Sequence, residues 1–133
     1  MKLSAKERTG LRAMVELARR YGEGPTALSE IAETQGLPLP YLERVVAALR
    51  DAGLLASVRG ARGGYLLGRA PAEISVSDVF CAVEGNLLTV DCLCADGSSC
   101  DREPECATRD VLETVRDCLA TTLGQISLAD VIA

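Results

Sequence analysis

The chain has 133 residues, 48% of them hydrophobic, with six cysteines and no histidine. This length fits one domain, or a small domain with an appendage, and the hydrophobic share is sufficient for an ordinary core. The N-terminal residues lack the apolar segment of a signal peptide, and no apolar run approaches the roughly 18 residues of a membrane span, so we expect a cytoplasmic protein.

The two halves of the sequence differ in charge. Residues 1–70 contain eleven Lys and Arg against seven Asp and Glu, a net charge of +4, whereas residues 71–133 contain three against twelve, a net charge of −9. Contacts with phosphate depend on the local field and not on the overall charge of −5. The basic half is therefore a candidate for contact with nucleic acid, and an uneven scatter of charge without function is the alternative.

Three helices are predicted in the basic half. The first covers about residues 5–21, after a capping-box pattern at Ser4 and Glu7. The second covers residues 26–35 and stops at Gly36, and the third begins near Pro40 and stops at Gly53. Two short helices joined by a break that contains glycine are typical of a helix-turn-helix.

A β-hairpin is predicted after the third helix. Apolar strands at residues 54–58 and 65–67 flank a glycine-rich turn that contains Arg59 and Arg62. A hairpin in this position is a wing, so residues 1–70 are predicted to form a winged helix-turn-helix DNA-binding domain. The fold class is mainly α with a small β-hairpin.

The acidic half, residues 71–133, is predicted to hold a short helix over 76–84, a cysteine-rich loop and a long helix over about 105–124. The apolar stripe of the long helix exceeds what so small a domain covers, which favours a two-fold homodimer. Packing of this stripe on the first helix is the alternative. Cys81 and Cys118 fall on apolar helical faces and are interpreted as small core residues.

The outer face of the third helix carries the candidate base-reading residues. In a helix-turn-helix, the first residues of the second helix meet base edges in the major groove. Arg44 is the predicted base reader and Glu43 a discriminator, while Tyr41 either faces DNA or packs. At the wing tip, Arg59 and Arg62 are placed to approach the minor groove or the phosphates. Ordinary solvated side chains are the alternative for each.

Four cysteines lie between residues 92 and 106, and three of them, Cys94, Cys100 and Cys106, have the spacing C-x5-C-x5-C. In a reducing compartment such a group indicates metal ligands or reactive thiols before disulfides. The spacing lacks the close pairs of a zinc ribbon and fits an iron-sulfur cluster, held mainly by thiolates. Zinc and disulfides remain alternatives.

The segment LSEIAETQGLPLPYLERVVAALRDAGLLASVRGARGGYLLGR resembles the winged helix of the IscR-type regulators, in the Rrf family of bacterial transcription factors. The resemblance extends through ISVSDV and the triple-cysteine loop to ISLADVI. It implies a homodimer with one iron-sulfur cluster per subunit, 2Fe-2S in preference to 4Fe-4S, although the sequence does not fix the type. It also implies cluster ligation by Cys94, Cys100 and Cys106, a recognition helix carrying Tyr41, Glu43 and Arg44, and a wing carrying Arg59.

Three departures from the family pattern limit this transfer, and the first two leave the fourth cluster ligand open. Arg109 stands where iron-sulfur assembly regulators have a histidine, and Arg8 stands where some nitric-oxide-sensing relatives have a carboxylate. Pro38 and Pro40 replace serines that many relatives have at the start of the recognition helix. The candidate fourth ligands are Cys92 first, then the carboxylates of Glu105, Asp110 and Asp101, and more remotely Glu7.

The sequence thus predicts a transcription regulator whose operator binding is modulated by an iron-sulfur cluster and which controls genes for iron-sulfur cluster assembly. One alternative is a cluster-free regulator that senses oxidation by forming a disulfide at Cys92 or Cys94. Another is an iron-sulfur carrier that uses the winged part for protein contacts. An enzyme is not expected, because the chain has neither a histidine for acid-base work nor a nucleophile motif.

Overall fold

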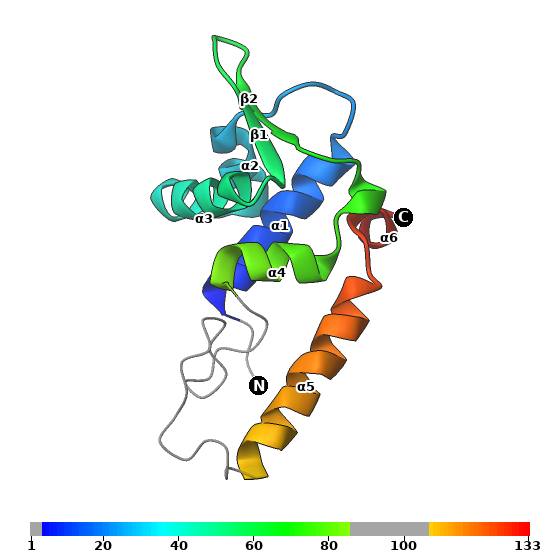
Figure 1. The fold of residues 1–133 in the computed structure, drawn as a ribbon. Coiled ribbons are helices and arrows are strands. Elements are labelled where there is room, and N and C mark those ends of the chain that lie inside the picture. The colour runs from blue at the N-terminus through cyan, green and yellow to red at the C-terminus, as the bar shows by residue number, and fades with distance from the viewer. Residues whose placement is uncertain (1–3, 86–106) are drawn as a thin grey trace.

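The computed structural model describes residues 4–85 and 107–133. In this part the fold is mainly helical with a single antiparallel hairpin, which confirms the predicted fold class (Figure 1). No helix in the described residues is both long and apolar enough to span a membrane. The elements are α1 (Ala5–Arg19), α2 (Leu28–Gln35), α3 (Leu39–Asp51), β1 (Leu55–Val58), β2 (Gly64–Leu67), the 3-10 turn η1 (Pro71–Glu73), α4 (Val76–Glu84), α5 (Ala107–Gly124) and α6 (Leu128–Ile132).

Helix α1 is the centre of the fold, because α2, α3, α4, α6 and β2 all pack against it. It begins with the predicted capping box, in which Ser4 Oγ accepts the Glu7 N–H at 3.0 Å and Glu7 Oε2 accepts the Ser4 N–H at 3.1 Å. Gly10 allows the close approach of α4, since a Cβ there would lie 3.1 Å from Val83 Cγ1. A bulkier residue at this position would push the two helices apart.

The hydrophobic core draws residues from both halves of the sequence. Met14 of α1, Val79 of α4 and Leu128 of α6 are all fully buried in one cluster. The acidic half is thus packed on the winged part through α4 and α6. The functional division of the chain at residue 70 stays a prediction. The other largest buried side chains are Ile31, Leu42, Val46, Leu49 and Ile74.

The α2–α3 pair forms the predicted helix-turn-helix. Helix α2 ends at Gly36, which has the left-handed conformation (φ 62°, ψ 40°), and the Leu37 N–H then bonds the Ala32 carbonyl at 2.9 Å. The helix begins at Leu28 and not at Thr26 as predicted. The reason is that Thr26 pairs with Tyr65 of β2 in an antiparallel bridge, with N···O distances of 3.0 and 2.8 Å.

The wing is the β1–β2 hairpin, with Leu55 opposite Leu67 and Val58 opposite Gly64. Its turn depends on close backbone contacts. A Cβ at Gly63 would lie 2.2 Å from the Val58 carbonyl oxygen, and a Cβ at Gly64 would lie 2.2 Å from that of Thr26. The two adjacent glycines of the motif are therefore required by the closeness of neighbouring backbone.

Helices α4 and α6 start in the same way and are bonded to each other. Each follows an Ile-Ser pair, with a capping box between Ser75 and Asp78 in one and between Ser127 and Asp130 in the other. The Ser127 N–H and hydroxyl hold the pKa of Asp130 below its ordinary value. The Val76 N–H bonds the Ile126 carbonyl and the Leu128 N–H bonds the Ile74 carbonyl, both at 2.9 Å. This bridge attaches the C-terminal end of α5 to the base of α4.

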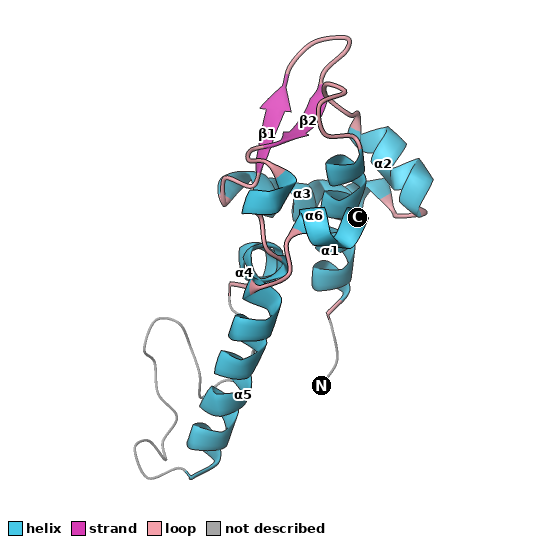
Figure 2. Cartoon of the chain, turned by 90° about the vertical axis from the view of Figure 1, so that its right-hand side faces the viewer, coloured by secondary structure: helices cyan, strands magenta, loops and turns pink. Residues whose placement is uncertain are grey.

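Helix α5 extends away from the other elements, as Figures 1 and 2 show from two directions. Cys118 of α5 and Cys81 of α4 are both exposed, so their interpretation as core residues was wrong. The buried face of α4 consists of Val76, Val79 and Phe80, which leaves Cys81 on the outer side. Cys118 is exposed because the described elements of a single chain cover little of α5.

Candidate nucleic-acid interface

Helix α3 has one buried face and one exposed face. Leu42, Val45, Val46 and Leu49 recur at helical spacing and enter the core. Glu43 and Arg44 are exposed on the opposite side, where a recognition helix meets base edges. Tyr41 is half-buried and packs against the core, so both readings of its role apply.

Neither Glu43 nor Arg44 forms an ion pair with another residue in the described part of the chain. The neighbouring pair on the same helix, Arg50 and Asp51, is 3.7 Å apart and well exposed. Charged groups that are unpaired and solvated at an exposed surface are available to a ligand at little cost, because no existing contact has to be broken. The early turns of α3 therefore present one cation and one anion to solvent.

The wing tip adds two further cations. Arg59 and Arg62 are exposed in the turn between β1 and β2, and the described residues provide no carboxylate partner for either. The bridge from Thr26 to Tyr65 fixes the base of the hairpin to the segment that enters α2. The helix-turn-helix and the wing are thus held together by backbone hydrogen bonds, and the structure unites Glu43, Arg44, Arg59 and Arg62 in one winged module.

A polar network that the sequence analysis missed connects α1 to α2. Glu16 is only 6% exposed, and its carboxylate accepts from Arg20 Nε at 2.9 Å and from Gln35 Nε2 at 3.1 Å. Arg12 donates to the Gln35 side-chain and backbone oxygens. The spacing of Arg12, Glu16 and Arg20, four residues apart on one helix face, is the signal that indicated such a network. These contacts join α1 to the first helix of the helix-turn-helix.

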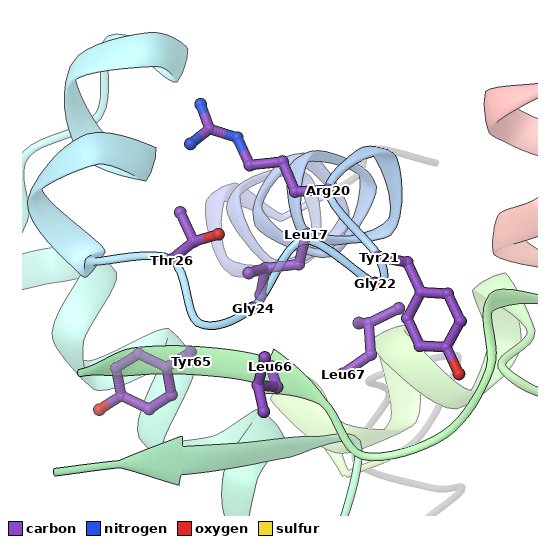
Figure 3. A pocket seen from close by; sticks show the side chains of 9 residues that line it. All are labelled: Leu17, Arg20, Tyr21, Gly22, Gly24, Thr26, Tyr65, Leu66 and Leu67. Atoms are coloured by element: carbon purple, nitrogen blue, oxygen red, sulfur yellow. The ribbon is translucent and has the colours of Figure 1, made fainter. Parts of the chain in front are cut away.

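A hollow of about 260 Å³ lies between the end of α1, the segment after it and β2 (Figure 3). Leu17, Tyr21 and Leu67 supply much of its apolar lining. Its charged residue, Arg20, is already paired with Glu16 and Glu30, and its guanidinium points away from β2 in Figure 3. The hollow therefore offers no free charge to a ligand.

Comparison with known proteins identifies the family. The sequence matches the Rrf2 family, described as iron-dependent transcriptional regulators, over residues 3–133. The chain belongs to the Rrf2 family. It is 43% identical to the transcriptional regulator CymR of Bacillus subtilis, over 98% of this chain and 88% of that protein. It is 37% identical to the regulator IscR of Xenorhabdus nematophila, over 99% of this chain and 79% of that protein.

Solved structures of Rrf2-family proteins have the same fold. CymR of B. subtilis, described as the global cysteine regulator, superposes with a TM-score of 0.79 at 41% identity, over 99% of this chain and 96% of that chain. IscR of T. potens superposes with a TM-score of 0.79 at 42% identity, over 99% and 86% of the two chains. The protein is thus a transcriptional regulator with the winged-helix fold and not an enzyme. Membership of this family implies DNA binding.

The predicted cluster ligands of this Rrf2-family chain fall mostly outside the described residues. These are Cys92, Cys94, Cys100 and Cys106, together with Asp101 and Glu105. Of the other candidates, Asp110 is exposed in the first turn of α5, and Glu7 is buried in the capping box of α1. Within residues 4–85 and 107–133, no group of three or more His, Cys, Asp or Glu could hold a metal ion.

Proposed function

We propose that this Rrf2-family regulator is a homodimer that binds an operator through α3 and the wing. We further propose that an iron-sulfur cluster bound by Cys94, Cys100 and Cys106 changes its affinity for DNA, and that it controls genes for iron-sulfur cluster assembly. The observation that carries the DNA-binding part is the unpaired, exposed Arg44 and Glu43 on α3 beside an arginine-tipped wing.

The residue chemistry gives each interface side chain a role. Arg44 can donate two hydrogen bonds to guanine, and Glu43 can accept from the amino group of cytosine, so the pair selects among base pairs in the major groove. Tyr41 can contribute its hydroxyl at the flank of α3. Arg59 and Arg62 approach the minor groove or the phosphates, where guanidinium groups are favoured by the negative potential. Arg44 and Glu43 thus read the operator, and Arg59 and Arg62 of the wing position the duplex.

The donor set of the chain fits an iron-sulfur cluster, and we propose 2Fe-2S in preference to 4Fe-4S because the family resemblance implies it. Thiolates are the usual ligands of such clusters, and this chain has three at even spacing and a fourth close by. A bound cluster would supply a redox-active and labile group. Among the fourth-ligand candidates, Cys92 is preferred to Asp101, Glu105 and Asp110. Glu7 is the least suited, because one of its oxygens already accepts the Ser4 N–H.

Helix α4 is the element that connects the cysteine segment to the recognition helix. It ends at Glu84, shortly before residues 86–106, and it packs against both α1 and α3. A change in the ligand state of the cysteines can therefore reach α3 through one helix. Such coupling requires the two states to differ in their affinity for the operator.

The test begins with protein purified and reconstituted without oxygen. We expect visible absorbance and a stoichiometric content of iron and sulfide, and we expect Cys100→Ala to lose both while keeping the helical circular dichroism of the wild type. Cys118→Ala is the matched control and should keep its colour, because Cys118 is an exposed residue of α5. Colourless, iron-free wild-type protein would rule out the cluster, and equal operator affinity with and without it would rule out the switch.

A second candidate is a cluster-free regulator that responds to oxidation of its thiols. It is supported by the similarity to CymR of B. subtilis, described as the global cysteine regulator, and to CymR of Staphylococcus aureus, which was solved in an oxidised form. This candidate expects iron-free protein whose operator binding changes with diamide and recovers with dithiothreitol. Cys92→Ala or Cys94→Ala would remove that response. The carrier alternative instead expects no salt-dependent DNA affinity.

A further inference from the structure

A groove of about 190 Å³ lies where α1, α3 and α4 meet, beside the interface that α3 and the wing form. Lys6 comes from α1 and Val83 from α4, and the remaining lining residues, Tyr41, Arg44, Val45 and Ala48, come from α3. The three helices pack against one another at this place (Figure 1). Tyr41, Arg44 and Ala48 recur at helical spacing, so one flank of the recognition helix forms a wall of the groove.

The groove combines an apolar floor with an excess of positive charge. Val45, Ala48 and Val83 supply the floor, and Lys6 and Arg44 supply two cations. In the described residues neither cation has an ion-pair partner. The acidic groups at this end of α1 have other contacts, because Glu7 accepts the Ser4 N–H at 3.1 Å and Glu84 accepts the Ser4 hydroxyl at 2.5 Å. An anion entering the groove would therefore meet two available positive charges.

The position of Lys6 is unfavourable for the helix that carries it. Lys6 is the second residue of α1, and a cation in the first turn opposes the helix dipole. It is exposed and adds nothing to the core. Removing its charge should therefore leave the stability of the fold unchanged or slightly higher. A contribution of Lys6 to ligand binding can thus be measured without a loss of folding.

We infer that this groove binds one phosphate of the DNA backbone beside the base pairs that α3 reads, an inference that rests on the proposed DNA binding. A recognition helix in the major groove is bordered by the sugar-phosphate backbone, and phosphate contacts fix its register on the duplex. Arg44 is exposed on α3 and also lines the groove, so in a complex with DNA it would lie next to both bases and backbone. Lys6 supplies a point charge, which suits a phosphate oxygen.

The experiment compares Lys6→Gln with wild type on the operator and on an unrelated duplex, over a series of salt concentrations. Loss of one phosphate contact should reduce the magnitude of the slope of log K against log salt by about 0.9. At roughly 0.1 M salt, this change corresponds to an affinity for DNA that is about eightfold weaker. The loss should be equal on both duplexes. Lys6→Arg keeps the positive charge and should restore the wild-type slope and affinity. Arg116→Gln makes the same charge change on α5 and should leave the slope unaltered.

The outcomes separate this inference from the proposed function. If wild-type protein shows no salt-dependent affinity for DNA, the proposed function fails and the groove assignment fails with it. If wild type binds DNA but Lys6→Gln keeps the wild-type slope, only the groove assignment is overturned. A second experiment tests whether free phosphate binds at Lys6. Wild type and Lys6→Gln are titrated with inorganic phosphate at constant ionic strength, and binding is monitored by amide NMR shifts. Lys6-dependent phosphate shifts with an unchanged DNA slope would show a free-anion site and overturn the DNA assignment.

Discussion

At the residue scale, Glu16 combines deep burial with two hydrogen bonds, from Arg20 and Gln35. Removing one partner of a buried carboxylate lowers stability, because the groups that remain lose their hydrogen bonds and stay buried. We expect Glu16→Gln to lower the free energy of unfolding by about 2 kcal/mol, since the amide would direct a donor at another donor. Urea denaturation followed by circular dichroism measures this change.

Glu30 provides the matched control for Glu16. It pairs with the same arginine at 3.3 Å, but its side chain is 59% exposed, so water screens the interaction. Glu30→Gln should cost well under about 1 kcal/mol. Equal losses of stability in the two variants would show that burial does not set the strength of the network.

The site residues show how far single positions can be judged from sequence. The exposure of Glu43 and Arg44 was predictable, because the apolar residues of α3 recur every three or four positions and mark the opposite face. Cys81 and Cys118 were misjudged because a small, weakly apolar side chain at the edge of a helical stripe gives no signal of which neighbour covers it. The environment of Lys6 depends on α3 and α4, which are remote in sequence, and no local pattern indicates it.

At the element scale, the wing requires glycine at positions where backbone atoms of a neighbouring segment lie too close for a side chain. A Cβ at Gly64 would overlap the Thr26 carbonyl oxygen at 2.2 Å, so Gly64→Ala must separate β2 from the segment that enters α2. We expect a stability loss of about 2 kcal/mol and a fall in operator affinity of about tenfold, equivalent to about 1.4 kcal/mol. Thermal melting and DNA titration measure the two effects. Gly124→Ala is the control, because its Cβ would meet nothing within 4 Å. Wild-type operator affinity in Gly64→Ala would contradict the role assigned to the backbone bridge between Thr26 and Tyr65.

Element boundaries followed local patterns except where a distant strand or helix intervened. The predicted short helix over residues 76–84 agrees with α4, which has its own capping box and a glycine at its end. The start of α2 was displaced because Thr26 is bonded to Tyr65 across the fold. Helix α6 was not predicted, although ISLADV at residues 126–131 repeats the pattern of ISVSDV at residues 74–79. Its five residues are too few to form a stable helix alone, and burial of Leu128 against α1 and η1 holds it in place.

At the scale of the whole molecule, the described structure leaves much of α5 uncovered. Val111 is 62% exposed, and Leu112, Val115 and Leu119 are only half-buried. Among the described elements α5 packs mainly on α4, while its end is attached through the bridge to Ile74 and Val76. An apolar helix face of this length is a candidate for pairing with its copy about a two-fold axis. Such a pair would present two recognition helices to two half-sites of one operator.

The homodimer is tested by introducing charge on this face. In Val111→Glu/Val115→Glu each carboxylate would be buried against its copy without a partner, so the molar mass should fall from twice 14.0 kDa to 14.0 kDa by analytical ultracentrifugation. Operator affinity should fall with it, because a single recognition helix has one half-site to bind. Ala120→Glu adds one such carboxylate at an exposed position of α5 and should remain dimeric. The contrary result would be wild-type protein that sediments as a monomer at micromolar concentration but still binds a two-half-site operator cooperatively. The subunits would then associate only on DNA, and α5 would not mediate a dimer in solution.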